Sequence, residues 1–185
     1  GGGVGALGAP RRLVDAGTAA VGVPGNRDTL LGAAFERATG ATLWREGFVA
    51  TLGPAGRRVA FVHGDALCTL DRGYQRLRRL LRSGPVRWAS RRAPLWLARR
   101  IGHRLRAESE GRKPFKLADE RSIRRAAVSA LAAETRADTV VCGHAHVHRD
   151  EDLDGVRWIV TAAWRETECD RLAVTDEHRV DVRSS

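Results

Sequence analysis

The sequence predicts an α/β fold of layered sheets and helices, and three observations support this. First, short apolar runs closed by Gly or Pro alternate with segments of helical periodicity in the first 65 residues. Second, a length of 185 residues with 43% hydrophobic and 29% charged residues suits one globular domain with a sizeable core. Third, no apolar run reaches the roughly 18 residues that a membrane span needs.

The first part of the chain reads as alternating helix and strand. Residues 11–16 resemble the end of a helix, and Ala19–Val23 is an apolar run closed by Pro24-Gly25, which predicts a buried strand. Helical spacing covers Thr29–Thr39 and stops at Gly40. Further strands are expected at 42–44, 48–52 and 58–62, with a turn at 54–56.

Residues 71–136 contain no convincing strand and are rich in Arg, Leu and Ala. Helical periodicity appears at 74–82, 95–106 and 119–134. Because strand-like runs flank this stretch, we expect a helical cap insertion at 72–136 within a single domain covering 1–185. The later strands are predicted at 139–142, 156–162 and 172–175, as an antiparallel closing set.

The formal net charge of +10 favours polyanionic partners such as phosphorylated substrates, acidic lipid or nucleic acid. The three cysteines have irregular spacing and form no C-x-x-C motif, which fits a reducing cytosol better than a disulfide framework. Cys142 ends an apolar run and reads as a small buried residue. We therefore expect a cytoplasmic protein.

Three predicted strands end in the same way, with a metal-capable side chain next to a glycine. The first runs into Gly25-Asn26-Arg27-Asp28, the second into His63-Gly64-Asp65, and the third into Gly143-His144-Ala145-His146. In open α/β sheets, ligands bind outside the carboxyl ends of the strands. The sequence therefore predicts that four nitrogen and oxygen ligands, Asn26, His63, His144 and His146, converge on one edge.

Imidazole with amide or carboxylate oxygen suits Mn, Fe, Zn or Co. His144 and His146 are one residue apart, so on an extended segment both point the same way, and they either bind one metal each or share a pair. A lone histidine after a strand is usually an ordinary polar residue. Three such motifs in order, with G-H-x-H last, favour a metal site.

The series GNRD, HGD and GHAH resembles the second half of the pattern of calcineurin-like metallophosphoesterases. The segments GNRDTLLG and FVHGDALCTLDRGYQRLRR resemble one branch, the UDP-2,3-diacylglucosamine diphosphatases of lipid A synthesis. The resemblance implies a layered αββα sandwich with a helical cap. It also implies two divalent metal ions, with Mn²⁺ expected, held by Asn26, His63, His144 and His146.

The same resemblance raises an expectation about the start of the chain. Family members also carry an Asp-x-His motif on their first strand and a Gly-Asp motif on their second, and neither precedes Asn26 here. We therefore expect a protein whose N-terminal strands are missing from this sequence. We also expect the chain alone to be inactive as a fragment.

Arg27 narrows the expected chemistry. General members of the superfamily have a histidine there, which protonates an alkoxide leaving group. Arginine cannot donate a proton at neutral pH, but it holds phosphate oxygens bidentately. A phosphate leaving group needs no proton donor, so Arg27 favours cleavage of a pyrophosphate. With Asn26 and His144 as its partners in catalysis, the resemblance implies attack on the phosphorus next to uridine, giving UMP and an acylated glucosamine 1-phosphate.

The resemblance places substrate contacts at Asn26, Arg27, Asp71, Ser109, Lys113, Lys116 and His144. The two lysines are the only ones among 32 basic residues, and both fall in this substrate segment, although Lys113 stands where asparagine is usual. Asp71 has an alternative role as an ordinary helix N-cap, and Ser109 as a solvent-facing hydroxyl.

The arginine-rich cap helices allow two interpretations, a helix packed on the core with a solvated face and a cap that contacts the anionic inner-membrane surface. Two alternative functions also stay open. One is a related metallophosphoesterase acting on another nucleotide pyrophosphate or a phosphodiester. The other is a non-catalytic basic nucleic-acid-binding module, which explains the charge but neither the three motifs nor the absence of interleaved aromatic residues.

Overall fold

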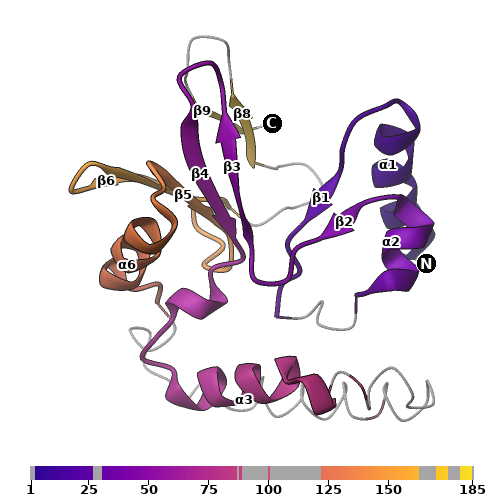
Figure 1. Cartoon of the computed structure of the whole chain (residues 1–185), viewed down its shortest axis with the longest axis horizontal. Coiled ribbons are helices and arrows are strands. Elements are labelled where there is room, and N and C mark those ends of the chain that lie inside the picture. The colour runs from indigo at the N-terminus through magenta and orange to yellow at the C-terminus, as the bar shows by residue number, and fades with distance from the viewer. Residues whose placement is uncertain are drawn as a thin grey trace. The chain divides into compact units, whose positions relative to one another are not determined.

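The computed structural model describes residues 3–26, 31–86, 88, 100, 122–162, 170–174 and 180–184. The chain divides into two compact units (Figure 1). The first unit comprises Gly1–Asp65 and Arg125–Ser185, and the second comprises Ala66–Arg124.

The first unit is built on a five-stranded sheet in the order β3-β4-β5-β7-β6. Its inner strands β4, β5 and β7 are parallel, whereas β3 and β6 pair antiparallel at the two edges. The strands are β3 (Phe48–Leu52), β4 (Arg57–Val62), β5 (Thr139–Cys142), β6 (Arg149–Leu153) and β7 (Val156–Val160). Parallel strands in the middle of a sheet are buried on both faces, which explains the continuous apolar run TVVC of β5.

The core lies on the three inner strands. Val59 of β4, Val141 of β5 and Ile159 of β7 form one buried cluster, against which Leu52 and Phe61 pack. Helix α6 (Arg125–Thr135) packs on β5 and β7 and buries Val128.

The C-terminus of α6 is held by an arginine from the sheet. Arg58 donates from Nε to the carbonyl of Arg136 at 3.1 Å and from Nη2 to the carbonyl of Thr135 at 2.9 Å. The last carbonyls of a helix lack partners within the helix, and a basic side chain stabilises them. Arg58 therefore links β4 to the helix that precedes β5.

Two smaller sheets complete the first unit. β1 (Val21–Gly22) pairs in parallel with β2 (Thr42–Leu43), and β8 (Asp170–Val174) pairs antiparallel with β9 (Val180–Ser184). Helix α1 (Gly3–Asp15) packs against α2 (Ala33–Thr39), which ends at Gly40 in the left-handed conformation. Glycine adopts this conformation without a steric penalty, so the predicted stop at Gly40 is confirmed.

The second unit begins within the 3₁₀ helix η1 (Asp65–Leu67) and contains helix α3 (Arg72–Arg82). The amide of Arg124 donates to the carbonyl of Leu67 at 3.1 Å, so the two ends of this unit lie side by side. Among the helices in the described ranges, none is long and apolar enough to cross a membrane.

The predicted α/β class is confirmed, because a mixed five-stranded sheet carries α6 against it and further helices accompany the smaller β1–β2 sheet. Strands β3 and β5 have the predicted bounds, and α3 begins two residues before its predicted start. The closing strands were only partly predicted, because β7 is parallel to β5 while β6 and β8–β9 supply the antiparallel pairs.

Several predicted bounds need correction. The strand expected at Ala19–Val23 is confined to Val21–Gly22, and the helix expected at Thr29–Thr39 begins at Ala33. The helix expected at 119–134 begins at Arg125, and it belongs with the sheet rather than with the second unit. Apart from Arg100, the helix expected at 95–106 lies outside the described residues, and the cap insertion at 72–136 stays a prediction.

Candidate functional site

His63 and His144 come together because β4 and β5 are parallel neighbours. Their last residues, Val62 and Cys142, are paired, so both chains leave the sheet at the same edge. The amide of Gly143 donates to the carbonyl of His63 at 3.1 Å and joins the two strand ends. His63 Nε2 lies 3.3 Å from His144 Nδ1, and the two rings meet edge to face with centroids 5.1 Å apart.

The segment that carries His144 and His146 is not extended. Both residues have positive φ, 66° for His144 and 57° for His146. The prediction that alternation makes them point the same way was therefore wrong in its premise. Non-glycine residues adopt positive φ at a cost of about 1–2 kcal/mol each, and such strain is concentrated at functional sites. His144 is half-buried, whereas His146 is exposed.

The surroundings of His144 favour its neutral form. Burial lowers the pKa of His144 below its ordinary value, the charge of His63 lowers it further, Asp65 opposes this by raising it, and His146 lowers it again. A neutral imidazole is the form that donates a lone pair to a metal ion. Asp65 is almost fully buried at 2% exposure, two residues after His63. No role was predicted for Asp65 from the sequence, although its place in the HGD motif was the available signal.

Asn26 lies in a different setting. It follows β1 of the two-stranded sheet, after the buried Pro24 and Gly25, and its own side chain is exposed. Arg27 lies outside the described residues. Within the described part of the chain, no group of three or more His, Cys, Asp or Glu side chains gathers in a way that could hold a metal ion. The four predicted ligands therefore stay predictions, with His63 and His144 as the pair that the structure brings together.

Arg45 was not singled out from the sequence, yet it contacts the chain shortly after Arg27. Its Nη2 donates to the carbonyl of Leu31, the first described residue after Arg27 and its neighbours. Arg45 also follows β2, whose carboxyl end lies at the same edge as that of β1 because the two strands are parallel. No feature of the sequence distinguishes this arginine from the many others.

The predicted substrate residues Ser109, Lys113 and Lys116 lie outside the described residues. Asp71 is the N-cap of α3, and its Oδ1 accepts a hydrogen bond from the Tyr74 amide at 3.0 Å. The capping alternative for Asp71 is therefore observed. Its role toward substrate stays a prediction.

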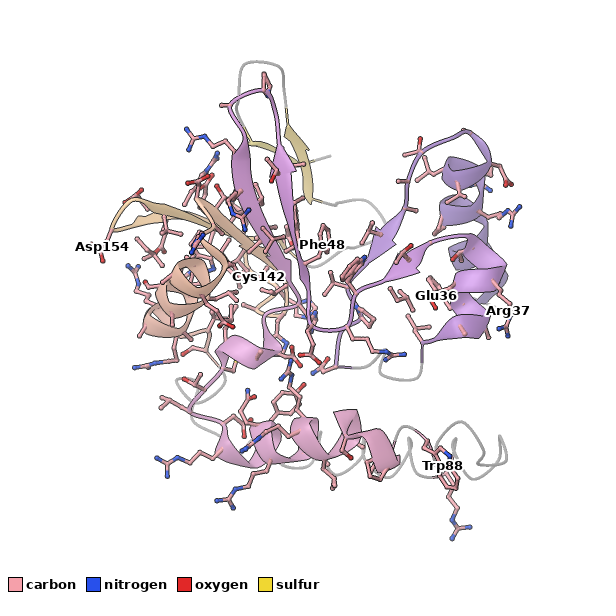
Figure 2. All side chains as sticks on the ribbon, in the orientation of Figure 1. Glu36, Arg37, Phe48, Trp88, Cys142 and Asp154 are labelled. Carbon is pink, nitrogen blue, oxygen red and sulfur yellow. The ribbon has the colours of Figure 1, made fainter. Side chains whose placement is uncertain are left out.

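Cys142 is a core residue, as predicted. It is 2% exposed at the end of β5, where Figure 2 labels it, and its Sγ accepts a hydrogen bond from Trp158 Nε1 at 3.3 Å. Burial raises the pKa of the Cys142 thiol, while the Trp158 hydrogen bond lowers it by a smaller amount. The thiol therefore stays protonated at neutral pH. Its hydrogen bond to Trp158 holds the end of β5, which leads directly to His144.

No protein-family model matches the chain. Individual relatives do, and the three described next carry the name UDP-2,3-diacylglucosamine hydrolase. Two are from strains of Pseudomonas putida, one 38% identical over 138 residues and the other 40% identical over 160 residues. These alignments cover 75% and 84% of this chain, and 57% and 66% of the relatives. A third, from Aeromonas hydrophila, is 38% identical over 149 residues, which is 78% of this chain and 61% of that protein.

The chain thus spans less than two thirds of the length of these relatives. Identity near 40% nevertheless extends over most of the residues that the chain has. The chain belongs to the same sequence family as the UDP-2,3-diacylglucosamine hydrolases.

Proposed function

We propose that the protein containing this chain hydrolyses the pyrophosphate of UDP-2,3-diacylglucosamine to UMP and 2,3-diacylglucosamine 1-phosphate, in lipid A synthesis. The observation that carries the proposal is identity of 36–40% to proteins with that activity in their names. The adjacent His63 and His144, at the carboxyl ends of neighbouring parallel strands, support it. A calcineurin-like layered sandwich is part of the same proposal.

The donor set fits a divalent transition metal. Imidazole nitrogen with amide oxygen is the ligand chemistry that Mn, Fe, Co and Zn accept. His63 Nε2 and His144 Nδ1 lie 3.3 Å apart. We assign His63, His144, His146 and Asn26 as the residues that would hold two ions, with Mn²⁺ expected. When bound, such ions act as Lewis acids on phosphoryl oxygens and supply a nucleophile at neutral pH.

The remaining residues of the site would bind and orient the substrate. Arg27 would hold phosphate oxygens bidentately and stabilise charge that develops on them, without transferring a proton. Lys113 and Lys116 would act as point charges toward the same phosphates, and Ser109 and Asp71 as hydrogen-bonding groups. For Asp71 this role has to coexist with the cap of α3.

The decisive experiment measures UMP release from UDP-2,3-diacylglucosamine by the protein expressed from its full gene, with Mn²⁺ and with a chelator. His144→Ala is expected to lower the rate by at least about 100-fold, because loss of one ligand outweighs the 10–100-fold cost of losing a ligand's partner. His148→Ala is the matched control, since His148 is an exposed histidine in the same loop.

Three outcomes would contradict the proposal. Cleavage of a generic phosphodiester or another nucleotide pyrophosphate without UMP release from the acylated UDP-sugar would make the protein a related metallophosphoesterase. Equal activity of the His144 and His148 variants would remove the histidine pair from the mechanism. DNA binding that weakens steeply with salt, with no hydrolysis, would indicate a nucleic-acid-binding module.

We also propose that the second unit contacts the anionic cytoplasmic surface of the inner membrane. Two of its large apolar side chains are strongly exposed, Leu80 at 59% and Trp88 at 60%, and Figure 2 labels Trp88 just beyond the end of α3. Several arginines lie on the same helix, Arg72, Arg76, Arg78, Arg79 and Arg82. Exposed apolar side chains beside basic ones favour adsorption to acidic lipid.

Co-sedimentation with vesicles tests the membrane proposal. Vesicles containing acidic lipid are expected to bind the protein more tightly than zwitterionic ones. Trp88→Ser should weaken this binding, whereas Trp44→Ser should not, since Trp44 is similarly exposed at 50% but belongs to the first unit. Equal losses in the two variants would refute the assignment to the second unit.

A further inference from the structure

We infer that Gly64 is a positioning residue, whose missing side chain sets the spacing between the imidazoles of His63 and His144. Gly64 is buried between His63 and Asp65 and has φ of +105°, a conformation that L side chains rarely adopt. A Cβ at this position would lie 3.2 Å from His144 Cβ and 3.3 Å from Cys142 Cβ. It would also lie 3.4 Å from the carbonyl oxygen of Gly143.

These neighbours cannot rotate away. A Cβ atom is fixed by its own backbone, and Cys142 belongs to β5 and is hydrogen-bonded to the buried Trp158. Contacts of 3.2–3.3 Å to such atoms are tighter than ordinary packing, so one chain segment has to shift by a few tenths of an ångström. The amide of Gly143 is hydrogen-bonded to the carbonyl of His63, so the two segments that would have to separate are the one that carries His63 and the one that carries His144.

The second glycine of the site behaves differently. A Cβ on Gly143 would meet Thr161 Oγ1 at 3.6 Å and the carbonyl of His63 at 3.8 Å, which are ordinary contacts. Of these two glycines, Gly64 is therefore the one whose lack of a side chain is required for space. The space that it leaves is taken up by the approach of the two strand ends that bear His63 and His144.

Gly155 supplies a matched control for backbone strain. It has φ of +87°, and nothing lies within 4 Å of a Cβ built on it. It sits in the turn between β6 and β7, next to Asp154 at the hairpin tip labelled in Figure 2. Gly155→Ala therefore imposes a similar backbone restriction without moving the histidines.

The primary test uses the metal-free chain. In the parent protein, nuclear Overhauser contacts between the ring protons of His63 and His144 are expected, because the centroids lie 5.1 Å apart. Gly64→Ala should weaken or abolish these contacts, and Gly155→Ala should preserve them at a comparable loss of hydrogen-exchange protection in the sheet. Preserved ring contacts in the Gly64 variant would overturn the inference.

The consequence for metal binding rests on the proposed function and has its own readout, titration with Co²⁺ followed by its visible spectrum. Gly64→Ala should weaken Co²⁺ binding by roughly tenfold or more, the scale seen when the support of a ligand is lost, and Gly155→Ala should not. Unchanged Co²⁺ affinity in Gly64→Ala would overturn the inference. If the parent chain binds no Co²⁺ while the ring contacts respond as expected, the metal assignment fails and the role of Gly64 is supported.

Gly64→Asn covers the case in which Gly64→Ala does not fold. Asparagine carries the same Cβ but tolerates positive φ better than alanine. A folded Gly64→Asn protein without the His63–His144 ring contact supports the inference, and one that keeps the contact overturns it. Failure of both variants to fold also overturns it, because Gly64 would then be a requirement of the fold rather than of the imidazole spacing.

Discussion

Ile159 offers a quantitative test of the sheet that carries the histidine pair. Its side chain is fully buried on β7 and packs with Val59 and Val141. Ile159→Ala removes three buried carbon groups, each worth about 0.8 kcal/mol in transfer free energy, or about 2.4 kcal/mol in sum. The cavity adds to this, so the expected loss in the free energy of unfolding is about 3–4 kcal/mol. Ile159→Val removes one group and should cost about 1 kcal/mol.

Hydrogen exchange of the amides of β5 and β7 is the appropriate assay. The chain has two compact units, so one global unfolding transition cannot be assumed, and exchange reports the sheet itself. Val49→Ala on the edge strand β3 is the control, since Val49 is 38% exposed and its truncation should cost less than about 1 kcal/mol. The reasoning fails if Ile159→Ala costs no more than Val49→Ala, or if the Val and Ala variants cost the same.

Three further results are expected. Asp150 accepts hydrogen bonds from Arg157, which lower the pKa of its carboxyl below the ordinary value. At pH values above the ordinary pKa, the pair should therefore add less than about 1 kcal/mol to the free energy of unfolding, a small amount because both side chains are about a third exposed. This contribution should be lost as pH falls through the lowered pKa of Asp150. Acid unfolding of Asp150→Asn should lack this pH dependence. Asp71→Ala should cost about 1 kcal/mol and Asp71→Asn almost nothing, measured as exchange of the Tyr74 amide, because Asn also caps helices. Cys142 should react with a thiol reagent only on unfolding, as read by peptide mass mapping; fast labelling of the folded chain would contradict its burial.

The strands that could be predicted are those whose apolar runs reflect burial on both faces. TVVC of β5 is buried at every position and was predicted with its observed bounds. β6, with the sequence RDEDL, was not predicted, because an edge strand needs only one partner and keeps its charged residues in solvent. Two acidic residues of β6 pair with arginines of two other elements. Asp150 forms an ion pair with Arg157 of β7, and Glu151 forms one with Arg125 of α6. These pairings are invisible in a hydrophobicity pattern.

The candidate site could be predicted from the sequence only as far as the order of the strands in the sheet could be predicted. Motifs after two apolar runs meet if the runs become parallel neighbours, as β4 and β5 do. Asn26 follows a strand that joins a different sheet, so the same rule does not bring it to the histidines in the described residues. The positive φ values of His144 and His146 carry no sequence signal, because the residues themselves are histidines rather than glycines.

Hydrogen bonds at both ends of the strand pair fix the register of β4 and β5 that brings these histidines together. At the start, the Arg58 amide donates to Asp138 Oδ2 at 2.9 Å, and the Asp138 amide donates back to the Arg58 carbonyl at 2.8 Å. At the carboxyl end, the Gly143 amide bonds the His63 carbonyl. A slip of one residue would break both sets of bonds and turn the buried side chains of each strand to the opposite face. The spacing of the imidazoles is therefore set by an aspartate at the far end of the strands as well as by Gly64 beside them.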